Sequence, residues 1–426
     1  MKTVFDQMQE IGAAANIENF RVMQGWSYLQ KVSHAEKAAR TFYDRNRAEG
    51  RNVHVSVGGL DSITLHYFLE EIGVHAPCIS CSTLEGKGVQ IVHRQIRDEM
   101  ARDYADWEAC NGALPQDEID AIEDPALRTD EQRRLDSIPP RPEMCFLTPI
   151  KPKVQVIREF GWPVLSKEIA GKIALLQNPS DKNRTVRHAI ITGETGEYGG
   201  NQKHSRMKMS QKWLEKFGGA DTEGAALGYA TAPFKVSDRC CYYLKEKPCN
   251  DWAKAHNSVP YLGLMASEGG RRQKALMMHG CNYFGESTIR SAPFAIFDRQ
   301  DLLQLAVDLH VPVPTEYGEI VRGKDGLWRT TIAQRTGCTM CGFGIHLEQR
   351  PHRFDRLRDA NPSEWEFWMR HVCQDENGDW YGWGRVLDYI GVEWENEPGQ
   401  IAGQLSFEEF LAKSPTRRTS SGRAKR

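Results

Sequence analysis

Long hydrophobic runs are absent from this sequence of 426 residues. No apolar stretch reaches the roughly 18 residues that a membrane-spanning helix needs, and Met1–Gln7 has no apolar signal core. An excess of one charge is also missing, because 55 Lys and Arg residues face 57 Asp and Glu residues, for a formal net charge of -2. These absences exclude a globally basic nucleic-acid coat and predict a cytoplasmic protein without a membrane partner.

Composition places the chain among globular proteins, with 40% hydrophobic, 26% charged and 9% aromatic residues. No internal repeat is found. At roughly 150 residues per domain, the length allows two or three domains or one large α/β domain with insertions.

Cysteine is the unusual component, since the chain has 11. An odd number in a long chain without a signal segment argues against a secreted disulfide framework and for cytosolic thiols. Six of them form close pairs, which suggests metal or redox chemistry: Cys78 with Cys81, Cys240 with Cys241, and Cys338 with Cys341. Because Cys78 and Cys81 fall in a predicted strand that would point them to opposite faces, we expect burial for that pair.

The first part of the chain has the βαβα pattern of a parallel sheet. After a helical lead-in over 1–50, the pattern predicts a strand at Asn52–Val57, a helix at Asp61–Ile72, a strand at Ala76–Ser82 and a helix at Gly88–Trp107. Further strands are expected at Pro163–Ser166, Pro260–Ser267 and Phe294–Phe297.

Irregular segments and changes of composition suggest the domain boundaries. We predict a main domain over 51–335 with an exposed insertion at 114–142, and a Cys- and Trp-rich region over 336–413. A basic, glycine-rich loop at 192–212 and a basic, disordered tail at 414–426 complete the outline. Four tryptophans are expected to fill the core of the C-terminal region: Trp365, Trp368, Trp380 and Trp383.

The sharpest local signal is the paired glycine Gly58-Gly59 between a strand and a helix that begins near Asp61 and Ser62. Such a turn directs backbone N–H groups and the positive end of a helix toward a bound phosphate. The same residues also fit an ordinary βα turn in which Asp61 or Ser62 caps the helix. The glycines alone do not decide between these interpretations.

The complete string resembles the pyrophosphate-binding loop of the PP-loop (ATP pyrophosphatase) superfamily, whose pattern is Ser-Gly-Gly-x-Asp-Ser. Gly58, Gly59, Asp61 and Ser62 match, whereas Val57 occupies the first serine position and Ser56 is displaced by one residue. A loose counterpart of the Thr-Gly-x-Glu turn near the adenosine contains Glu85. The resemblance implies ATP or another adenine nucleotide, with Mg²⁺, bound by residues 56, 58, 59, 61, 62 and 85.

Two cysteine motifs lie nearly a hundred residues apart, Cys240-Cys241 and Cys338-Thr-Met-Cys341. Four thiolates can hold a zinc ion or a [4Fe-4S] cluster, because soft sulfur ligands suit both. Zinc is the commoner metal, but an adjacent cysteine pair is unusual among structural zinc sites, and this favours the cluster.

The pairing of Cys-Cys with a distant Cys-x-x-Cys resembles the iron–sulfur members of the phosphoadenylyl-sulfate (PAPS) reductase family. The string from Cys240 to Pro248 and the segments at 260–272, 293–303 and 312–318 resemble further family motifs, over roughly Val53–Arg353. The resemblance implies a Rossmann-like, doubly wound α/β sheet of the adenine nucleotide alpha-hydrolase type. It also implies a [4Fe-4S] cluster on the four cysteines, and catalytic roles for Asp61, Lys245 and Arg272. Cys281 is a further candidate for a catalytic thiol, with burial as the alternative.

The family's reductases attack sulfate sulfur with a cysteine in a C-terminal motif, which this sequence lacks after Cys373. We therefore expect ATP-dependent sulfur transfer from a sulfur donor to a nucleic acid or a metabolite. One alternative is reduction of phosphoadenylyl or adenylyl sulfate to sulfite by a thiol reductant, and another is a non-catalytic regulator that binds zinc and nucleotide. The basic segments Lys203–Lys212 and 414–426 leave a nucleic-acid binder open as well.

Overall fold

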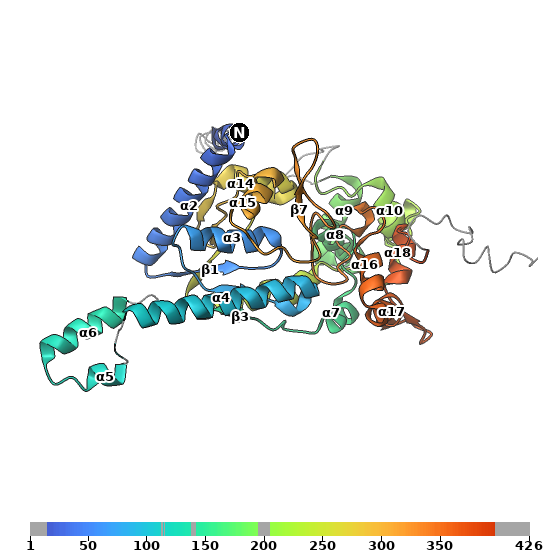
Figure 1. The fold of residues 1–426 in the computed structure, drawn as a ribbon. Coiled ribbons are helices and arrows are strands. Elements are labelled where there is room, and N and C mark those ends of the chain that lie inside the picture. Colours follow the sequence, from blue (N-terminus) through green and yellow to red (C-terminus); the bar gives the residue numbers. More distant parts are fainter. Residues whose placement is uncertain (1–14, 112–113, 115, 138–141, 195–204, 397–426) are drawn as a thin grey trace, which may run out of the picture. The chain divides into compact units, whose positions relative to one another are not determined.

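The computed structural model describes residues 15–111, 114, 116–137, 142–194 and 205–396 (Figure 1). Its contacts divide the chain into two units, each described here by itself. Unit 1 comprises Met1–Pro152 and Cys241–Thr339, and unit 2 comprises Lys153–Cys240 and Met340–Arg426. The domain boundaries expected from the sequence stay predictions, and the tail 414–426 and residues 195–204 of the basic loop lie outside the described residues.

Unit 1 is built on a six-stranded sheet in the order β3-β2-β1-β4-β6-β5. All neighbouring pairs are parallel except β5 with β6, so the predicted parallel α/β sheet is confirmed. The strands are β1 (Asn52–Ser56), β2 (Cys78–Ser80), β3 (Met144–Phe146), β4 (Ser258–Tyr261), β5 (Asn282–Phe284) and β6 (Ile289–Ser291). A separate hairpin joins β7 (Ile320–Arg322) to β8 (Trp328–Thr330).

The helices of unit 1 connect these strands. They are α2 (Tyr28–Ala48), α3 (Leu60–Glu71), α4 (Lys87–Asn111), α5 (Gln116–Asp120), α6 (Pro125–Ser137), α13 (Lys247–Ala255), α14 (Gly270–His279) and α15 (Arg299–Asp308). The expected insertion at 114–142 contains α5 and α6, which Figure 1 shows beyond the far end of α4. None of the described helices combines the length and the apolar character needed to cross a membrane.

The two faces of the sheet carry different side chains, as the alternation along a strand requires. Register places Val55 beside Cys78 and Tyr261 on one face, where the Tyr261 hydroxyl bonds the Ala39 carbonyl of α2 at 2.7 Å. Helices α3 and α4 are joined by a hydrogen bond of 2.6 Å from the Tyr67 hydroxyl to the Glu99 carboxylate.

The opposite face carries His54, whose ring lies 5.3 Å from that of Trp252 on α13. The side chain of His54 also bonds the Ser258 hydroxyl at 2.8 Å. Polar side chains on this face therefore lie between the sheet and α13, away from the large apolar core of unit 1.

Strand order reverses beside β1, because the chain proceeds from β1 through β2 to β3 on one side and returns with β4 on the other. In open α/β sheets, ligands bind at the carboxyl ends of the strands where this reversal opens a crevice. The topology therefore singles out the segments that follow β1 and β4, the first of which contains Gly58-Gly59.

Three expected strands differ from the structure. Phe294–Phe297 forms a turn, Pro163–Ser166 contributes only an isolated bridge at Leu165, and β4 ends at Tyr261 rather than continuing to Ser267. Phe294 and Phe297 are nevertheless completely buried in the core. A short apolar run predicts burial, but it does not distinguish a strand from a buried turn.

Unit 2 packs short helices around a second apolar core. Its elements are α7 (Lys153–Phe160), α8 (Lys167–Gln177), α9 (Arg184–Thr192), α10 (Gln211–Phe217), α11 (Thr222–Ala226), α16 (Arg353–Ala360), α17 (Pro362–Arg370), α18 (Trp383–Ile390) and the hairpin of β9 (Cys373–Gln374) with β10 (Trp380–Tyr381). Of the four tryptophans, Trp368 and Trp383 are buried in this core, Trp365 packs against it, and Trp380 is exposed, contrary to expectation.

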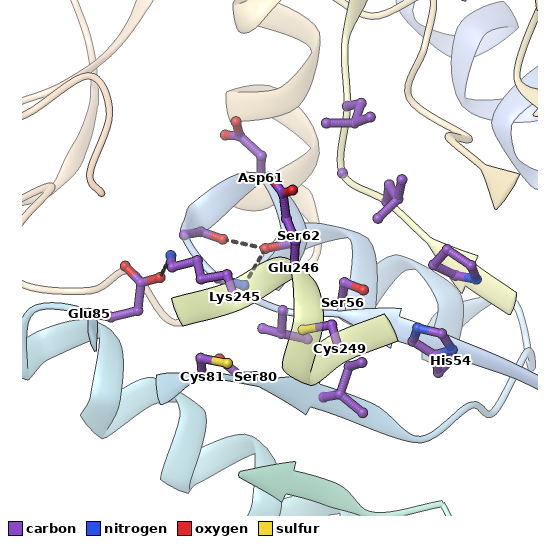
Figure 2. A pocket seen from close by; sticks show the side chains of 18 of the residues that line it. His54, Ser56, Asp61, Ser62, Ser80, Cys81, Glu85, Lys245, Glu246 and Cys249 are labelled. Carbon is purple, nitrogen blue, oxygen red and sulfur yellow. Dashed lines mark hydrogen bonds and ion pairs between the residues drawn. The ribbon is translucent and has the colours of Figure 1, made fainter. Parts of the chain in front are cut away.

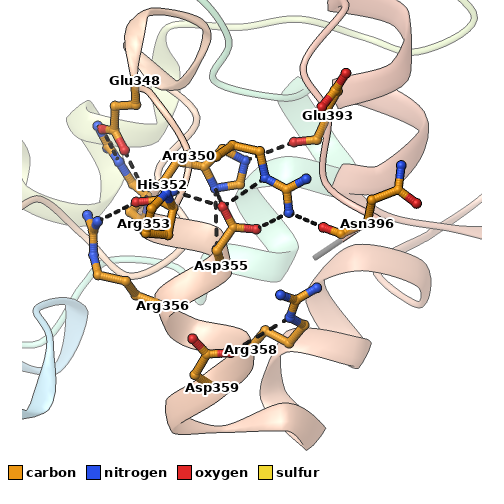
Figure 3. Close-up of polar contacts among 11 residues, drawn as sticks. Glu348, Arg350, His352, Arg353, Asp355, Arg356, Arg358, Asp359, Glu393 and Asn396 are labelled. Carbon is orange, nitrogen blue, oxygen red and sulfur yellow. Dashed lines mark hydrogen bonds and ion pairs between the residues drawn. The ribbon is translucent and has the colours of Figure 1, made fainter. Parts of the chain in front are cut away.

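A polar network fixes the start of α16 in unit 2 (Figure 3). Arg350 Nε donates to Asp355 at 3.2 Å, and the His352 backbone N–H donates to the same carboxylate at 2.8 Å. Burial would raise the pKa of Asp355, but His352 and Arg350 outweigh it and hold that pKa below its ordinary value. All these groups are used in joining the helix to the segment before it, which indicates a structural role.

Candidate functional site

A cavity of about 720 Å³ lies in unit 1 where the strand order reverses. Its walls come from segments distant in sequence: the loop after β1, the end of β2, the segment after β4, and the helical stretch that includes α13. Figure 2 shows Asp61 and Ser62 above the cavity, Glu85 and Lys245 at one side, and Cys249 and Cys81 within it. Cavities of this size accommodate small organic ligands.

The loop after β1 is held by its own serine. The Gly58 backbone N–H donates to the Ser62 hydroxyl oxygen at 2.7 Å, and that hydroxyl donates to the Gly59 carbonyl at 3.0 Å. Helix α3 follows immediately at Leu60, with Gly59 at its N-cap. The positive end of a twelve-residue helix thus opens onto the cavity.

His93 of α4 orients the same loop from behind. It is fully buried, and burial lowers its pKa, so the ring is neutral at pH 7. Its Nε2 lies 2.8 Å from the Gly58 carbonyl oxygen, which only accepts, and its Nδ1 lies 3.0 Å from the Ser82 hydroxyl. The proton must therefore reside on Nε2, and Nδ1 accepts from Ser82.

Tyr317 closes the loop on its other side. Its hydroxyl accepts a hydrogen bond from the Leu60 backbone N–H at 3.1 Å and lies 2.9 Å from the Thr336 hydroxyl. A Cβ atom on Gly59 would come within 2.4 Å of the Tyr317 hydroxyl oxygen. Glycine is required here for close approach, not for a positive φ, since its φ is −81°.

Charged side chains surround the cavity in pairs. Asp61 accepts from Arg299 at 2.6 Å, and burial raises the pKa of Asp61 although the guanidinium opposes this. Glu268 pairs with Arg272 at 2.7 Å and lies 3.7 Å from Arg335. Lys245, which pairs with Glu85, is the third cation that lines the cavity, beside Arg272 and Arg335.

The Lys245–Glu85 pair is the most deeply placed of these. The Glu85 side chain is 4% exposed, whereas a third of the Lys245 side chain remains accessible through the cavity. Burial would lower the pKa of Lys245, but Glu85 and the Cys338 thiol outweigh it and raise that pKa above its ordinary value. Lys245 is therefore a permanent cation in the wall of the cavity.

Eight residues expected from the sequence line this one cavity: Ser56, Gly58, Gly59, Asp61, Ser62, Glu85, Lys245 and Arg272. Cys281 is not among them. Its thiol is buried, lies 3.6 Å from His34 Nε2, and has a pKa raised by burial to about 12. Both observations fit a packed thiol rather than a reactive one.

The four cysteines expected to hold a cluster lie where the chain passes between the units. Cys241 and Cys338 belong to unit 1, and Cys240 and Cys341 to unit 2. Within the described ranges, no three His, Cys, Asp or Glu side chains are grouped as ligands of one metal ion. No chemical step is assigned to a metal group on these residues.

Comparison with models of protein families, with curated proteins and with solved structures gives no match for this chain.

Several residues of the site carry no recognisable signal in the sequence. His93 and Thr336 act on the loop from distant elements, and only the fold brings them there. Tyr317 lies in the segment 312–318 that resembles a family motif, but its contact with the loop was not predicted. Cys249 is not among the predicted site residues, because it stands apart from the close cysteine pairs. A signal for it does exist, since Lys245, Cys249 and Ala253 follow one another at helical spacing and all three line the cavity.

Proposed function

We propose that unit 1 binds an adenine nucleotide, preferably ATP, in an enzyme that activates an acceptor and transfers sulfur to it. The observation that carries the proposal is the position of the Gly58-Gly59 loop. It lies at the carboxyl end of β1, at the start of α3, and opens into the cavity at the reversal of strand order. Topology, loop and cavity thus coincide at one place.

Phosphate groups fit the polar side of the cavity. The loop and the start of α3 offer positive backbone potential, and Lys245, Arg272 and Arg335 offer cationic side chains. Asp61, Glu85 and Glu268 are each paired with a cation, so Mg²⁺ would be held largely by the phosphate oxygens that accompany it.

The apolar side of the cavity fits the base. Ile79, Ala253, Pro260 and Leu262 line it, and flat aromatic bases are commonly bound between apolar groups of this kind. The cavity therefore offers an apolar region and a cationic region within one enclosure, as a nucleotide requires.

The proposed reaction has two displacements. An acceptor oxygen attacks the α-phosphorus of ATP and pyrophosphate leaves, and a nucleophilic sulfur then attacks the activated carbon and displaces AMP. Cationic side chains stabilise the negative charge that develops on the leaving pyrophosphate. Thiols in the wall, Cys81 and Cys249, support sulfur chemistry in this cavity.

A cluster on Cys240, Cys241, Cys338 and Cys341 is proposed separately, with zinc as the alternative. Four thiols of these two motifs suit either metal. Iron, sulfide and zinc analysis of anaerobically purified protein decides between them, and no step above depends on the result.

Replacing Arg272 by alanine tests the nucleotide site. Arg272 lines the cavity, whereas Lys274 on the same helix does not. We expect Arg272→Ala to weaken binding of Mg²⁺-ATP about three- to tenfold, because a largely exposed cation is removed, and Lys274→Ala to leave binding unchanged. Isothermal titration calorimetry measures both, and equal affinities for the two variants would contradict the placement of the phosphates.

The reaction class is tested with the reduced, metal-loaded protein. Transfer predicts that AMP and pyrophosphate form together when ATP, sulfide and a tRNA or DNA pool are supplied, and that the nucleic acid gains sulfur. Incubation with adenylyl sulfate or phosphoadenylyl sulfate and a dithiol is the matched assay. Stoichiometric release of sulfite in this second assay would replace sulfur transfer by sulfonucleotide reduction. If the nucleic acid gained sulfur without ATP, both reactions would be overturned.

A further inference from the structure

Two thiols from opposite walls of the cavity meet within it. Cys81 directly follows β2, and Cys249 is the third residue of α13. Both line the cavity (Figure 2), and neither is in a disulfide. They are 168 positions apart in sequence, so only the fold makes them neighbours.

The two thiols are hydrogen-bonded to each other. This bond lowers the pKa of Cys249 against the effect of burial, and the Lys245 ammonium acts in the same direction. The same bond, together with burial, raises the pKa of Cys81. Cys249 is half-buried at the cavity wall, whereas Cys81 is 5% exposed, so Cys249 is the thiol that a small molecule in the cavity reaches first.

Cys78 and Cys281, the other buried thiols among the described residues of unit 1, contact a histidine instead of a second thiol. Cys78, three residues before Cys81, lies on the opposite face of β2 and contacts His66 of α3 at 3.4 Å. Burial raises the pKa of Cys78 well above its ordinary value. The expected separation of Cys78 from Cys81 is therefore confirmed, and the partner of Cys81 is a cysteine from a different element.

We propose that Cys249 and Cys81 are a redox-active thiol pair that reduces small disulfides by thiol–disulfide exchange inside this cavity. The geometry supports it, because an accessible thiol and a hydrogen-bonded second thiol are the two parts that such exchange requires. The inference goes beyond the proposed function and holds whether or not a nucleotide is bound.

The exchange proceeds in two balanced steps. The Cys249 thiolate attacks one sulfur of a small disulfide, the S–S bond breaks, and one thiolate leaves and takes up a proton. Cys81, losing its proton, then attacks the Cys249 sulfur and expels the second thiol. The pair is oxidised by two electrons to an intramolecular disulfide, the small disulfide is reduced to two thiols, and an external dithiol reverses the change.

The test uses 2-hydroxyethyl disulfide, which is small and uncharged, on the reduced full-length protein without free reductant. Unreduced peptides are then analysed by mass spectrometry. We expect a peptide linked through Cys81 and Cys249 and release of two mercaptoethanol molecules per linked pair. Absence of that peptide, while other thiols are modified, would overturn the proposal.

Three serine variants assign the roles. Cys81→Ser should stop the reaction at the first step, leaving one hydroxyethylthio group on Cys249, and Cys249→Ser should abolish both the linked peptide and the rapid reaction. Cys78→Ser is the matched control and should form the linked peptide at the wild-type rate. A Cys249→Ser protein that is modified rapidly at Cys81 would reverse the assigned order and contradict the proposal.

Two further measurements keep the result interpretable. Alkylation of the wild-type protein, which needs no variant, should label Cys249 faster than Cys145, the half-buried thiol of β3 whose pKa is raised to about 12 by burial and Glu143. Mg²⁺-ATP affinity is measured on the same reduced samples. If the disulfide forms but Mg²⁺-ATP does not bind, the proposed function is refuted and the thiol pair is not. If Mg²⁺-ATP binds but the disulfide does not form, the thiol pair is refuted and the proposed function is not.

Discussion

Gly59→Ala is expected to weaken binding of Mg²⁺-ATP by more than tenfold and to lower the free energy of unfolding by about 1–3 kcal/mol, the usual range for overpacking. The added Cβ would lie 2.4 Å from the Tyr317 hydroxyl oxygen and 3.1 Å from the Thr336 hydroxyl oxygen. Tyr317 is 3% exposed and its hydroxyl is bonded to the Leu60 N–H, so it cannot move aside without losing that bond. The loop must shift, and calorimetric titration measures the consequence.

A neighbouring glycine provides the control. A Cβ on Gly58 would meet nothing closer than 3.8 Å, so Gly58→Ala should fold with nearly unchanged stability. The double variant Gly59→Ala with Tyr317→Phe removes the clashing oxygen and leaves the ring carbon that bore it 3.7 Å away. We expect it to recover part of the stability and affinity lost in Gly59→Ala. If the second substitution only adds to the damage of the first, the steric explanation is wrong.

The strand–loop–helix at the start of unit 1 was predictable because all its signals are local. Residues 52–57 alternate, the paired glycines break the strand, and apolar spacing resumes in α3. The observed β1 and α3 begin and end within two residues of the predicted bounds. Local sequence therefore specified the loop that the proposed nucleotide would contact first.

The surroundings of that loop were not predictable in the same way. Tyr317 and His93 reach it from positions 257 and 35 residues away from their partners, and no local pattern predicts these two contacts. Cys81 was expected to be buried, and it is, but its partner Cys249 comes from across the sheet. Pairing between distant elements depends on topology, which short motifs do not encode.

Apolar runs predicted burial more reliably than they predicted the type of secondary structure. Phe294–Phe297 was expected as a strand because it is short and apolar, and it lies in the core as a turn. Periodicity cannot separate these outcomes in four residues. Trp380 was expected to be buried, but half of this residue is exposed, because aromatic content alone does not establish burial.

Lys245→Met is expected to lower the free energy of unfolding of unit 1 by about 2–3 kcal/mol. Removing one partner of a buried pair usually costs about 3–5 kcal/mol because the other charge stays uncompensated, and the value is discounted since Lys245 is accessible through the cavity. Glu85, 4% exposed, is the charge left behind. Urea denaturation of the full chain, followed by tryptophan fluorescence, measures the loss.

Lys247→Met is the matched control, two residues further along the same helical stretch. Lys247 pairs with Asp251 at 2.7 Å, but both side chains are exposed, so we expect little change in stability. Mg²⁺-ATP binding should likewise be retained, because Lys247 does not line the cavity.

The double variant Lys245→Met with Glu85→Gln separates the two roles of the lysine. Replacing the carboxylate by an amide removes the uncompensated charge, so stability should return to within about 1 kcal/mol of the wild type, as paired removal of buried charges often permits. Affinity for Mg²⁺-ATP should stay reduced, because the cation that faces the phosphates is still absent. Recovery of both properties together would show that Lys245 serves only to neutralise Glu85, and would remove it from the proposed nucleotide site.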